Sequence, residues 1–224
     1  MSMSAEGGPP AADEETPPAA LVLGPRLSAA RKDAGVGLRE LARRIGVSPG
    51  LISLIENGRS APSVGTLYAI ARELGLSFDD LFNGASPAAA EEPSPIKVQH
   101  AQERPTVQLA TGVRWERLTR TARPDFEFLH VVYEVGGASC DADVKLQHGG
   151  QEFALLLEGS LGLTIADEEH RLEPGDSISF DAQVPHRIWN SGDRPAVAIW
   201  VVLQRRNDQR ALAPGRRRAK AKAE

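Results

Sequence analysis

The stretch of sequence that decides the fold is GLRELARRIGVSPGLISLIENGR, residues 37–59. Its first half carries apolar side chains three and four residues apart, so that they share one face of an α-helix. These side chains belong to Leu38, Leu41, Ala42 and Ile45. Gly46 can adopt the left-handed conformation that ends such a helix, because glycine has no β-carbon. The first half therefore predicts an amphipathic helix followed by a sharp turn.

A second short helix is expected directly after this turn. The Ser48 side chain can cap free backbone N–H groups, and Pro49 at the first helical position loses no hydrogen bond. We expect the helix to cover residues 49–56 and to stop at Asn57-Gly58, which tolerate a positive φ. Two helices joined by a turn of about four residues form a helix-turn-helix, an arrangement that places its second helix in the major groove of DNA.

Further helices are expected on both sides of this pair. Proline, serine and glycine residues mark their ends and predict helices within residues 25–35, 63–75 and 77–82. Five helices within about sixty residues would pack as a compact bundle. We assign this bundle to residues 21–83.

The remaining composition divides the chain into segments. The 224 residues are 41% hydrophobic and 25% charged, which is enough for two ordinary domains. Residues 1–20 and 84–105 lack an apolar period and are expected to be a disordered leader and a proline-rich linker. Residues 205–224 hold eight basic and two acidic residues, a charge of +6. They are expected to be a basic disordered tail, either merely solvated or in contact with DNA phosphates.

Charge and cysteine content bound the surroundings of the protein. The bundle holds eight basic and six acidic residues, whereas residues 84–204 hold ten basic and eighteen acidic ones, so the total of -4 hides a positive bundle. The single cysteine, Cys140, excludes an internal disulfide and fits a reducing cytoplasm. The longest apolar run, residues 196–203, is too short to span a membrane. We therefore expect a cytoplasmic protein without a membrane partner.

A different pattern begins at residue 106. Short apolar runs of period two alternate with turn-forming glycines, prolines and aspartates, which predicts an all-β sandwich or barrel over residues 106–204. The expected strands are 113–118, 126–135, 153–157, 161–165, 170–172, 177–180, 186–189 and 197–203. Within this region His148, Glu152 and His186 combine imidazole and carboxylate groups, which can hold a divalent metal and leave positions open.

The first region resembles the DNA-binding domain of the XRE family of phage-repressor-like helix-turn-helix proteins. The resemblance rests on RLSAARKDAG, LRELARRIGVS, ISLIENGR, PSVGTLYAIARELG and SFDDLF within residues 23–82. It implies an ion pair between Arg31 and Glu56 that holds the second helix of the motif. It also implies base or phosphate contacts from a set of residues comprising Arg39, Arg43, Ser48, Pro49, Gly50, Ser53, Leu54 and Arg59. For the arginines, a solvated helical face is the alternative.

The second region resembles the cupin family. QHGGQEFALLLEGSLGLTI and PGDSISFDAQVPHRIWN match the two motifs of that family, and imply a jelly-roll barrel with an interior pocket. The resemblance implies His148, Glu152 and His186 as ligands of Zn, Fe, Mn or Ni, although Leu146 occupies the position of a further family histidine. Alternatively, the histidines line a metal-free pocket for an organic effector. The expected pocket residues are Leu146, His148, Glu152, Ala154, Leu156, His186 and Ile188.

The sequence thus predicts an α+β multidomain protein, with an N-terminal five-helix lambda-repressor-like bundle and a C-terminal all-β cupin jelly-roll barrel. The expected function is that of a sequence-specific transcriptional regulator without enzymatic activity. It would bind a double-stranded DNA operator as a homodimer, and its cupin domain would bind a small-molecule effector. The alternative is a non-haem iron oxygenase or epoxidase, because hydroxypropylphosphonate epoxidase joins the same two kinds of domain.

Overall fold

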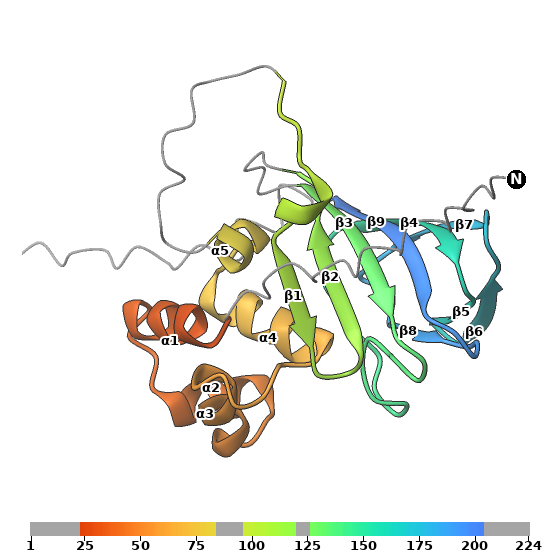
Figure 1. Ribbon diagram of the computed structural model, residues 1–224. Coiled ribbons are helices and arrows are strands. Elements are labelled where there is room, and N and C mark those ends of the chain that lie inside the picture. Colours follow the sequence, from red (N-terminus) through yellow and green to blue (C-terminus); the bar gives the residue numbers. More distant parts are fainter. Residues whose placement is uncertain (1–22, 84–95, 120–125, 204–224) are drawn as a thin grey trace, which may run out of the picture.

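A helical bundle followed by two β-sheets makes up the described part of the protein (Figure 1). The computed structural model describes residues 23–83, 96–119 and 126–203. The expected leader and tail, and residues 84–95 of the expected linker, lie outside the described residues. The expected combination of a helix-turn-helix bundle with a C-terminal β-domain is confirmed.

Five helices form the bundle in the described residues. They are α1 (Leu23–Asp33), α2 (Leu38–Ile45), α3 (Pro49–Glu56), α4 (Val64–Leu74) and α5 (Phe78–Asn83). Gly46 ends α2 at φ 75°, and its N–H donates to Ala42 O. The Ser63 side chain caps α4 by accepting from Thr66 N. Local capping therefore sets the ends of these elements, as the sequence predicts.

The start of α1 differs from the expectation. The helix already includes Leu23 and Gly24, which precede Pro25 and are both buried in the bundle. A β-carbon on Gly24 would lie 2.4 Å from Ile55 O, so only glycine allows α1 to approach α3 this closely. Pro25 therefore does not mark the start of this helix.

Nine strands form two sheets in the described residues. The strands are β1 (Thr106–Leu109), β2 (Val113–Arg117), β3 (Phe126–Tyr133), β4 (Gln151–Glu158), β5 (Leu161–Ile165), β6 (Glu168–Leu172), β7 (Ser177–Asp181), β8 (His186–Asn190) and β9 (Ala196–Leu203). One sheet has the order β1-β2-β3-β9-β4-β7, and the other has the order β6-β5-β8. Eight of the nine were expected. The short β1 was not, and a 3-10 helix (Ala101–Glu103) lies in the expected linker.

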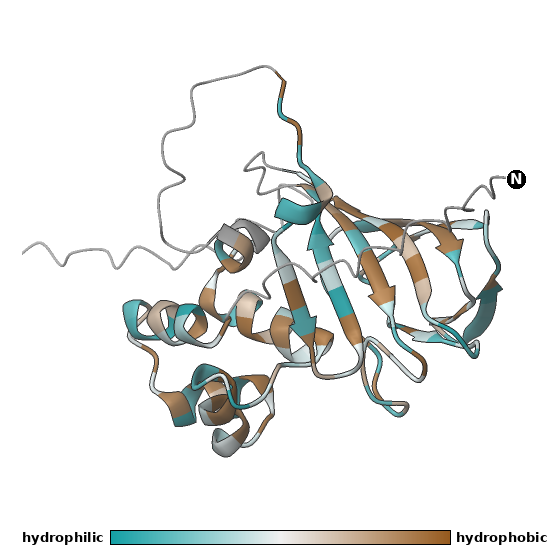
Figure 2. Ribbon diagram, in the orientation of Figure 1, coloured by the Kyte–Doolittle hydropathy of each residue, from teal (hydrophilic) through white to brown (hydrophobic). Residues whose placement is uncertain are grey.

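Burial alternates along the strands of the larger sheet and so separates an inner from an outer face. The residues of β3 and β9 are nevertheless mostly apolar (Figure 2). On β4, Glu152, Ala154 and Leu156 are buried, whereas Phe153, Leu155 and Leu157 are exposed. The inner residues form the core together with the opposite sheet. The outer face is nevertheless also largely apolar, which is unusual for a surface that meets water.

The bundle lies directly against the β-domain, with α4 and α5 beside β1 and β2 (Figure 1). The backbone joins them where Ala110 N donates to Pro62 O at 3.0 Å. The Arg117 guanidinium lies 5.9 Å from the centre of the Phe82 ring. The two domains therefore share an interface, and a ligand site there would belong to both. None of the helices in the described ranges is long and apolar enough to cross a bilayer.

Candidate DNA-binding helix and interdomain pocket

Helix α3 presents one face to the bundle and the other to solvent. Ser48 caps it by accepting a hydrogen bond from Leu51 N at 3.1 Å. Ile52 and Ile55 are buried in the bundle, whereas Pro49, Gly50 and Leu54 are exposed. The residues expected to face base edges therefore lie on an open surface.

An ion pair fixes α3 to α1. Arg31 Nε donates to Glu56 Oε1 at 2.6 Å, and a second guanidinium nitrogen donates to Oε2 at 2.8 Å. Ser28 Oγ donates to the same carboxylate at 2.9 Å. The Arg31 hydrogen bonds, working against burial, lower the pKa of Glu56. The two side chains are 10% and 8% exposed, so the pair is buried and sets the orientation of the helix.

The arginines near α3 differ in their freedom to meet phosphate. Arg39 and Arg59 are exposed. Arg43 is also exposed, but it contacts Glu40, and Arg44 bridges Glu40 to Glu73 of α4. The hydrogen bonds of Arg43 and then Arg44 lower the pKa of Glu40 to about 2. Arg43 therefore carries a nearby acidic charge that partly offsets its own, whereas Arg44 supports α4.

Asn57 was not among the expected contact residues. Its side chain is exposed and donates to Ser53 O at 2.8 Å, so its amide lies beside the Ser53 hydroxyl. The sequence marked Asn57 only as a helix stop. Its exposure at the end of α3 was the missing signal, and an amide is a suitable group for reading an adenine edge.

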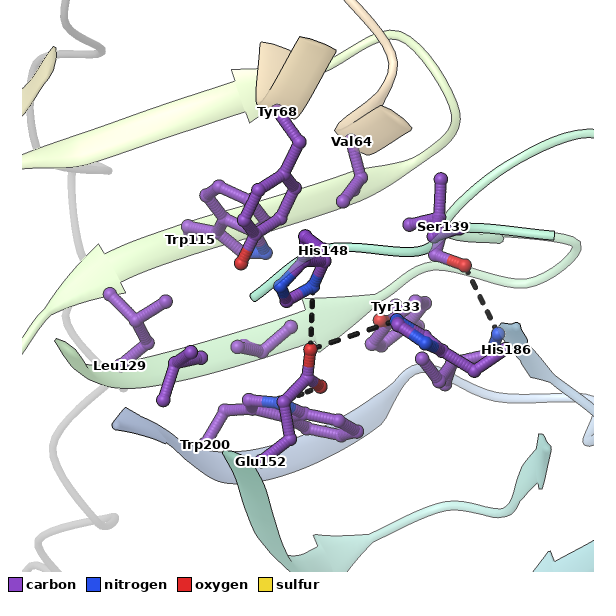
Figure 3. Close-up of a pocket in the computed structure, with 14 residues that line it drawn as sticks. Val64, Tyr68, Trp115, Leu129, Tyr133, Ser139, His148, Glu152, His186 and Trp200 are labelled. Carbon is purple, nitrogen blue, oxygen red and sulfur yellow. Dashed lines mark hydrogen bonds and ion pairs between the residues drawn. The ribbon is translucent and has the colours of Figure 1, made fainter. Parts of the chain in front are cut away.

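The pocket of the β-domain is lined by both domains (Figure 3). Its polar centre is the expected triad: His148 Nε2 lies 2.8 Å and His186 Nε2 3.7 Å from Glu152 Oε1. The second oxygen, Glu152 Oε2, accepts from Trp200 Nε1 at 2.7 Å. Potential ligand atoms of all three triad residues lie within 4.8 Å of one another. One metal ion could therefore contact all three.

The orientation of the two imidazoles supports this fit. His186 Nδ1 lies 2.8 Å from Val184 O, and His148 Nδ1 lies 3.0 Å from Gly149 O. A carbonyl oxygen only accepts, so each Nδ1 must carry the proton and each Nε2 points toward Glu152. Ligating histidines are commonly held by such a hydrogen bond from the other ring nitrogen. The residues present thus fit a divalent metal, and such an ion would supply Lewis-acid or structural chemistry there.

The pKa values show how the triad is charged without a metal. For His148, burial opposes the charged form, but the hydrogen bond and charge of Glu152 outweigh it and raise the pKa. For Glu152, burial acts upward, but His148 and His186 outweigh it and lower the pKa. Burial dominates at His186 and lowers its pKa. The triad therefore favours a charged His148–Glu152 pair beside a neutral His186.

Aromatic residues surround this pair. Tyr68 of α4 stacks on His148 with ring centres 4.1 Å apart and planes at 9°, and its ring meets Trp115 edge-on at 6.0 Å. Burial and then the charge of Glu152 raise the pKa of Tyr68 well above its ordinary value. Tyr68 was not expected at the pocket, since it lies in the DNA-binding bundle. Trp115 and Trp200 were also not among the expected pocket residues.

The expected pocket residues do not all border this space. Leu146, His148, Glu152, His186 and Ile188 line it, whereas Ala154 and Leu156 do not. Both are buried, but β4 carries them into the packed core between the sheets. Alternation predicts which face of a strand is inward, and it does not predict how far the cavity extends along that face.

The free space between these side chains is small. Its free volume is about 30 Å³, which on the usual scale accommodates roughly one or two water molecules. Pockets for organic ligands usually measure about 300 Å³ or more. In this conformation the pocket has room for an ion or water but not for an organic effector.

Fold and site together define the class: the chain belongs to the family of XRE-type helix-turn-helix proteins that carry a cupin domain. A helix-turn-helix model matches residues 27–81, and a cupin domain model matches residues 129–202.

Two relatives and one solved structure are similar to this chain. The HTH-type transcriptional regulator PuuR of Escherichia coli is 26% identical over 171 residues, which cover 76% of this chain and 89% of PuuR. The (S)-2-hydroxypropylphosphonic acid epoxidase of Streptomyces wedmorensis is 30% identical over 158 residues, 65% of this chain and 77% of the enzyme. The structure of an HTH_3 family transcriptional regulator from Vibrio cholerae matches with a TM-score of 0.58 at 23% identity, covering 83% and 96% of the two chains. This last likeness shows the fold alone.

Proposed function

We propose that this protein is a sequence-specific DNA-binding transcriptional regulator whose cupin pocket binds an effector. The observation that carries the proposal is the solvent-exposed face of α3 on a bundle held by the buried Arg31–Glu56 pair. A buried ion pair spanning two helices fixes the orientation of α3 in advance, so docking into a major groove costs little rearrangement. The relationship to PuuR, which is named a transcriptional regulator, supports the same function.

The exposed face suggests how DNA would be read. Ser53 and Asn57 offer a hydroxyl and an amide to base edges, and Leu54, 44% exposed, offers an apolar contact to a thymine methyl group. Arg39 and Arg59 are exposed and would contact phosphates. Sequence readout would therefore depend on a few short side chains, and the arginines would supply salt-dependent affinity.

Dimerisation is proposed through the outer face of the larger sheet. On this face, residues paired across the neighbouring strands β3, β9 and β4 form two rows of side chains, which are apolar except for one histidine. The rows are Phe128–Val201–Phe153 and His130–Ile199–Leu155. The three β4 residues Phe153, Leu155 and Leu157 are 36%, 41% and 43% exposed, so they present apolar area that a second copy would cover. A twofold pair would place the two α3 helices on half-sites about 34 Å apart.

The DNA-binding proposal is tested by selecting bound sequences from a random duplex library with the full-length chain, followed by mobility-shift titrations. We expect one enriched, roughly palindromic sequence. In the double variant Arg39→Ala with Arg59→Ala, the logarithm of the affinity should fall less steeply with the logarithm of the salt concentration. The slope should become shallower by about 0.9 for each phosphate that the protein no longer neutralises. The matched control is Arg171→Ala, which removes an exposed arginine from β6, on the β-domain. Failure to enrich any sequence, or unchanged affinity in the double variant, would contradict the proposal.

The proposed dimer has its own test. Phe153→Glu with Leu155→Glu should convert the protein from dimer to monomer in light scattering, because four buried carboxylates would face each other across the twofold axis. Val135→Glu is the matched control, since Val135 is 59% exposed outside the strands. A wild-type monomer at micromolar concentration, or a double variant that stays dimeric, would show that this face is not the interface.

An iron-dependent oxygenase is the second candidate, favoured by the convergence of His148, Glu152 and His186 and by the epoxidase relative. The triad would hold iron, and Tyr68 would shield the site from water. Anaerobic titration with Fe(II), followed by measurement of oxygen uptake with hydroxyalkyl phosphonates, separates the two functions. Substrate-dependent oxygen consumption would favour the enzyme, whereas tight operator binding without consumption would favour the regulator.

A further inference from the structure

We propose that Tyr68 is a residue of the effector site supplied by the DNA-binding domain, and that its displacement couples pocket occupancy to operator affinity. This inference rests on the proposed function. Tyr68 projects from α4 into the pocket and lies over His148 (Figure 3). Val64, one turn earlier on α4, also lines the pocket. The helix that closes the cavity is therefore part of the bundle that carries α3.

The pocket is too small for an organic ligand while Tyr68 lies in it. About 30 Å³ is free, so an organic molecule can reach the triad only after a lining group has moved. Most of the lining comes from the paired strands β2, β3, β4, β8 and β9, whose ladders hold their side chains in place. Tyr68 is instead contributed by the other domain, so its ring leaves the pocket if α4 moves away from the β-domain.

Helix α4 is rigidly connected to the rest of the bundle. Leu67, Ile70 and Ala71 are buried in the bundle core. On the outside, Arg44 of α2 contacts Glu73 of α4 at 2.7 Å. A displacement of α4 away from the pocket must therefore carry the helix-turn-helix with it as one body. In a dimer, a displacement of both bundles would change the distance between the two α3 helices. Recognition of the two half-sites depends on that distance.

Leu146 also lines the pocket and contacts the DNA-binding domain. It occupies the position at which the cupin pattern has a further histidine, and here it meets the first turn of α4. A β-carbon on Gly65 would lie 2.6 Å from Leu146 Cδ2, so the bundle and the β-domain are in close apolar contact. The position at which the cupin pattern has a metal-ligating histidine is therefore occupied here by Leu146, which packs the β-domain against α4. The departure from the family pattern fits a pocket whose roof belongs to the DNA-binding domain.

Linkage makes the coupling measurable without knowing the effector. If opening the pocket weakens operator binding, then operator binding must favour the closed pocket by the same factor. Accessibility of His148, measured by the rate of its modification with diethyl pyrocarbonate and mapped by mass spectrometry, reports this opening. We expect the selected operator duplex to slow modification of His148 by about 5- to 150-fold. His170, exposed on β6, serves as internal control and should not change.

Two variants at one position complete the experiment on EDTA-treated, full-length protein. Tyr68→Ala should accelerate modification of His148 and remove its dependence on operator, and it should change operator affinity at least fivefold. Tyr68→Phe keeps the stacked ring and should behave as the wild type. Thermal unfolding of the wild type and both variants checks that each protein is folded. The effect of operator on the modification of His148 is measured in the wild type, so that part of the experiment does not depend on a variant folding.

The outcomes separate this inference from the proposed function. Operator binding that leaves the His148 rate unchanged, together with equal operator affinity in Tyr68→Ala and wild type, overturns the coupling while the regulator stands. Absence of any selected operator overturns both. Slower modification of His148 on the operator, abolished in Tyr68→Ala and kept in Tyr68→Phe, supports the coupling.

Discussion

Replacing Glu56 by glutamine tests how far the buried ion pair holds the DNA-binding helix in place. The substitution keeps the size of the side chain and removes its charge. Arg31 would remain 8% exposed, with its bond to Val36 O intact, but without an anionic partner. Three hydrogen bonds to the carboxylate, at 2.6, 2.8 and 2.9 Å, would be broken or weakened.

The magnitude follows from the burial of the pair. Removing one partner of a buried ion pair costs about 3–5 kcal/mol, because the remaining charge is left uncompensated. Glutamine retains one acceptor oxygen, so we expect a loss of about 3 kcal/mol in the free energy of unfolding of the bundle. Replacing both Arg31 and Glu56 by methionine should recover most of this loss, because no charge then remains buried.

Acid should reduce the difference between wild type and Glu56→Gln. The pKa of Glu56 is lowered in the folded state from its ordinary value of 4.5, chiefly by Arg31. A lowered carboxylate pKa stabilises the fold above the ordinary value, and this contribution is lost as the pH falls through the lowered pKa. The difference between the two proteins should therefore be complete at neutral pH, begin to shrink as the pH falls below the ordinary value of 4.5, and disappear once the pH has fallen through the lowered pKa of Glu56.

Two signals separate the domains in this assay. Far-ultraviolet circular dichroism during urea unfolding follows the helices, whereas tryptophan fluorescence follows the β-domain, since Trp115, Trp189 and Trp200 all lie there. The loss should appear in the helical signal. A loss below about 1 kcal/mol, or a double methionine variant as unstable as Glu56→Gln, would refute the reasoning about an uncompensated buried charge.

Three further changes have definite expected outcomes. Gly24→Ala should destabilise the bundle by about 1–3 kcal/mol in urea unfolding, because its methyl group would collide with Ile55 O, and an unchanged midpoint would contradict the close approach of α1 and α3. Ser48→Ala should cost about 1 kcal/mol in the same assay, since it removes the cap of α3; no loss would show that the cap is replaceable. Divalent metal binding to EDTA-treated protein, measured by calorimetry, should strengthen by up to tenfold per pH unit as the pH rises from about 6.5 toward the raised pKa of His148, because His148 must release its proton to bind the metal; pH-independent binding, or undiminished binding in Glu152→Ala, would exclude this site.

The bundle could be predicted from sequence because its signals are local. Glycine at the end of α2, serine before α3 and apolar spacing of three and four residues each specify a nearby backbone conformation. The close approach of α1 to α3 could not be predicted in this way. It depends on contact between Gly24 and Ile55, thirty-one positions apart in the chain.

The pocket could be predicted only in part. His148, Glu152 and His186 lie within recognisable motifs, and the structure brings them together. Tyr68 lies between the core residues of α4 and carries no motif. Its contacts with Trp115 and His148 join positions 47 and 80 residues away, so only the packing of the two domains reveals its role. Contacts across a domain boundary, such as that of Tyr68 with His148, are the part that sequence patterns within each domain do not predict.

The same geometry gives the two possible occupants of the pocket opposite effects. His148, Glu152 and His186 can hold an ion within the existing volume while the Tyr68 ring stays stacked on His148. Binding in that arrangement would stabilise the closed interface between α4 and the β-domain. An organic molecule needs more space than about 30 Å³ and, under the proposed coupling, would gain it by displacing Tyr68, so its binding energy would be set against the loss of that stacking. A metal and an organic effector would therefore shift the position of the bundle in opposite directions, and would compete even where they share no ligand atom.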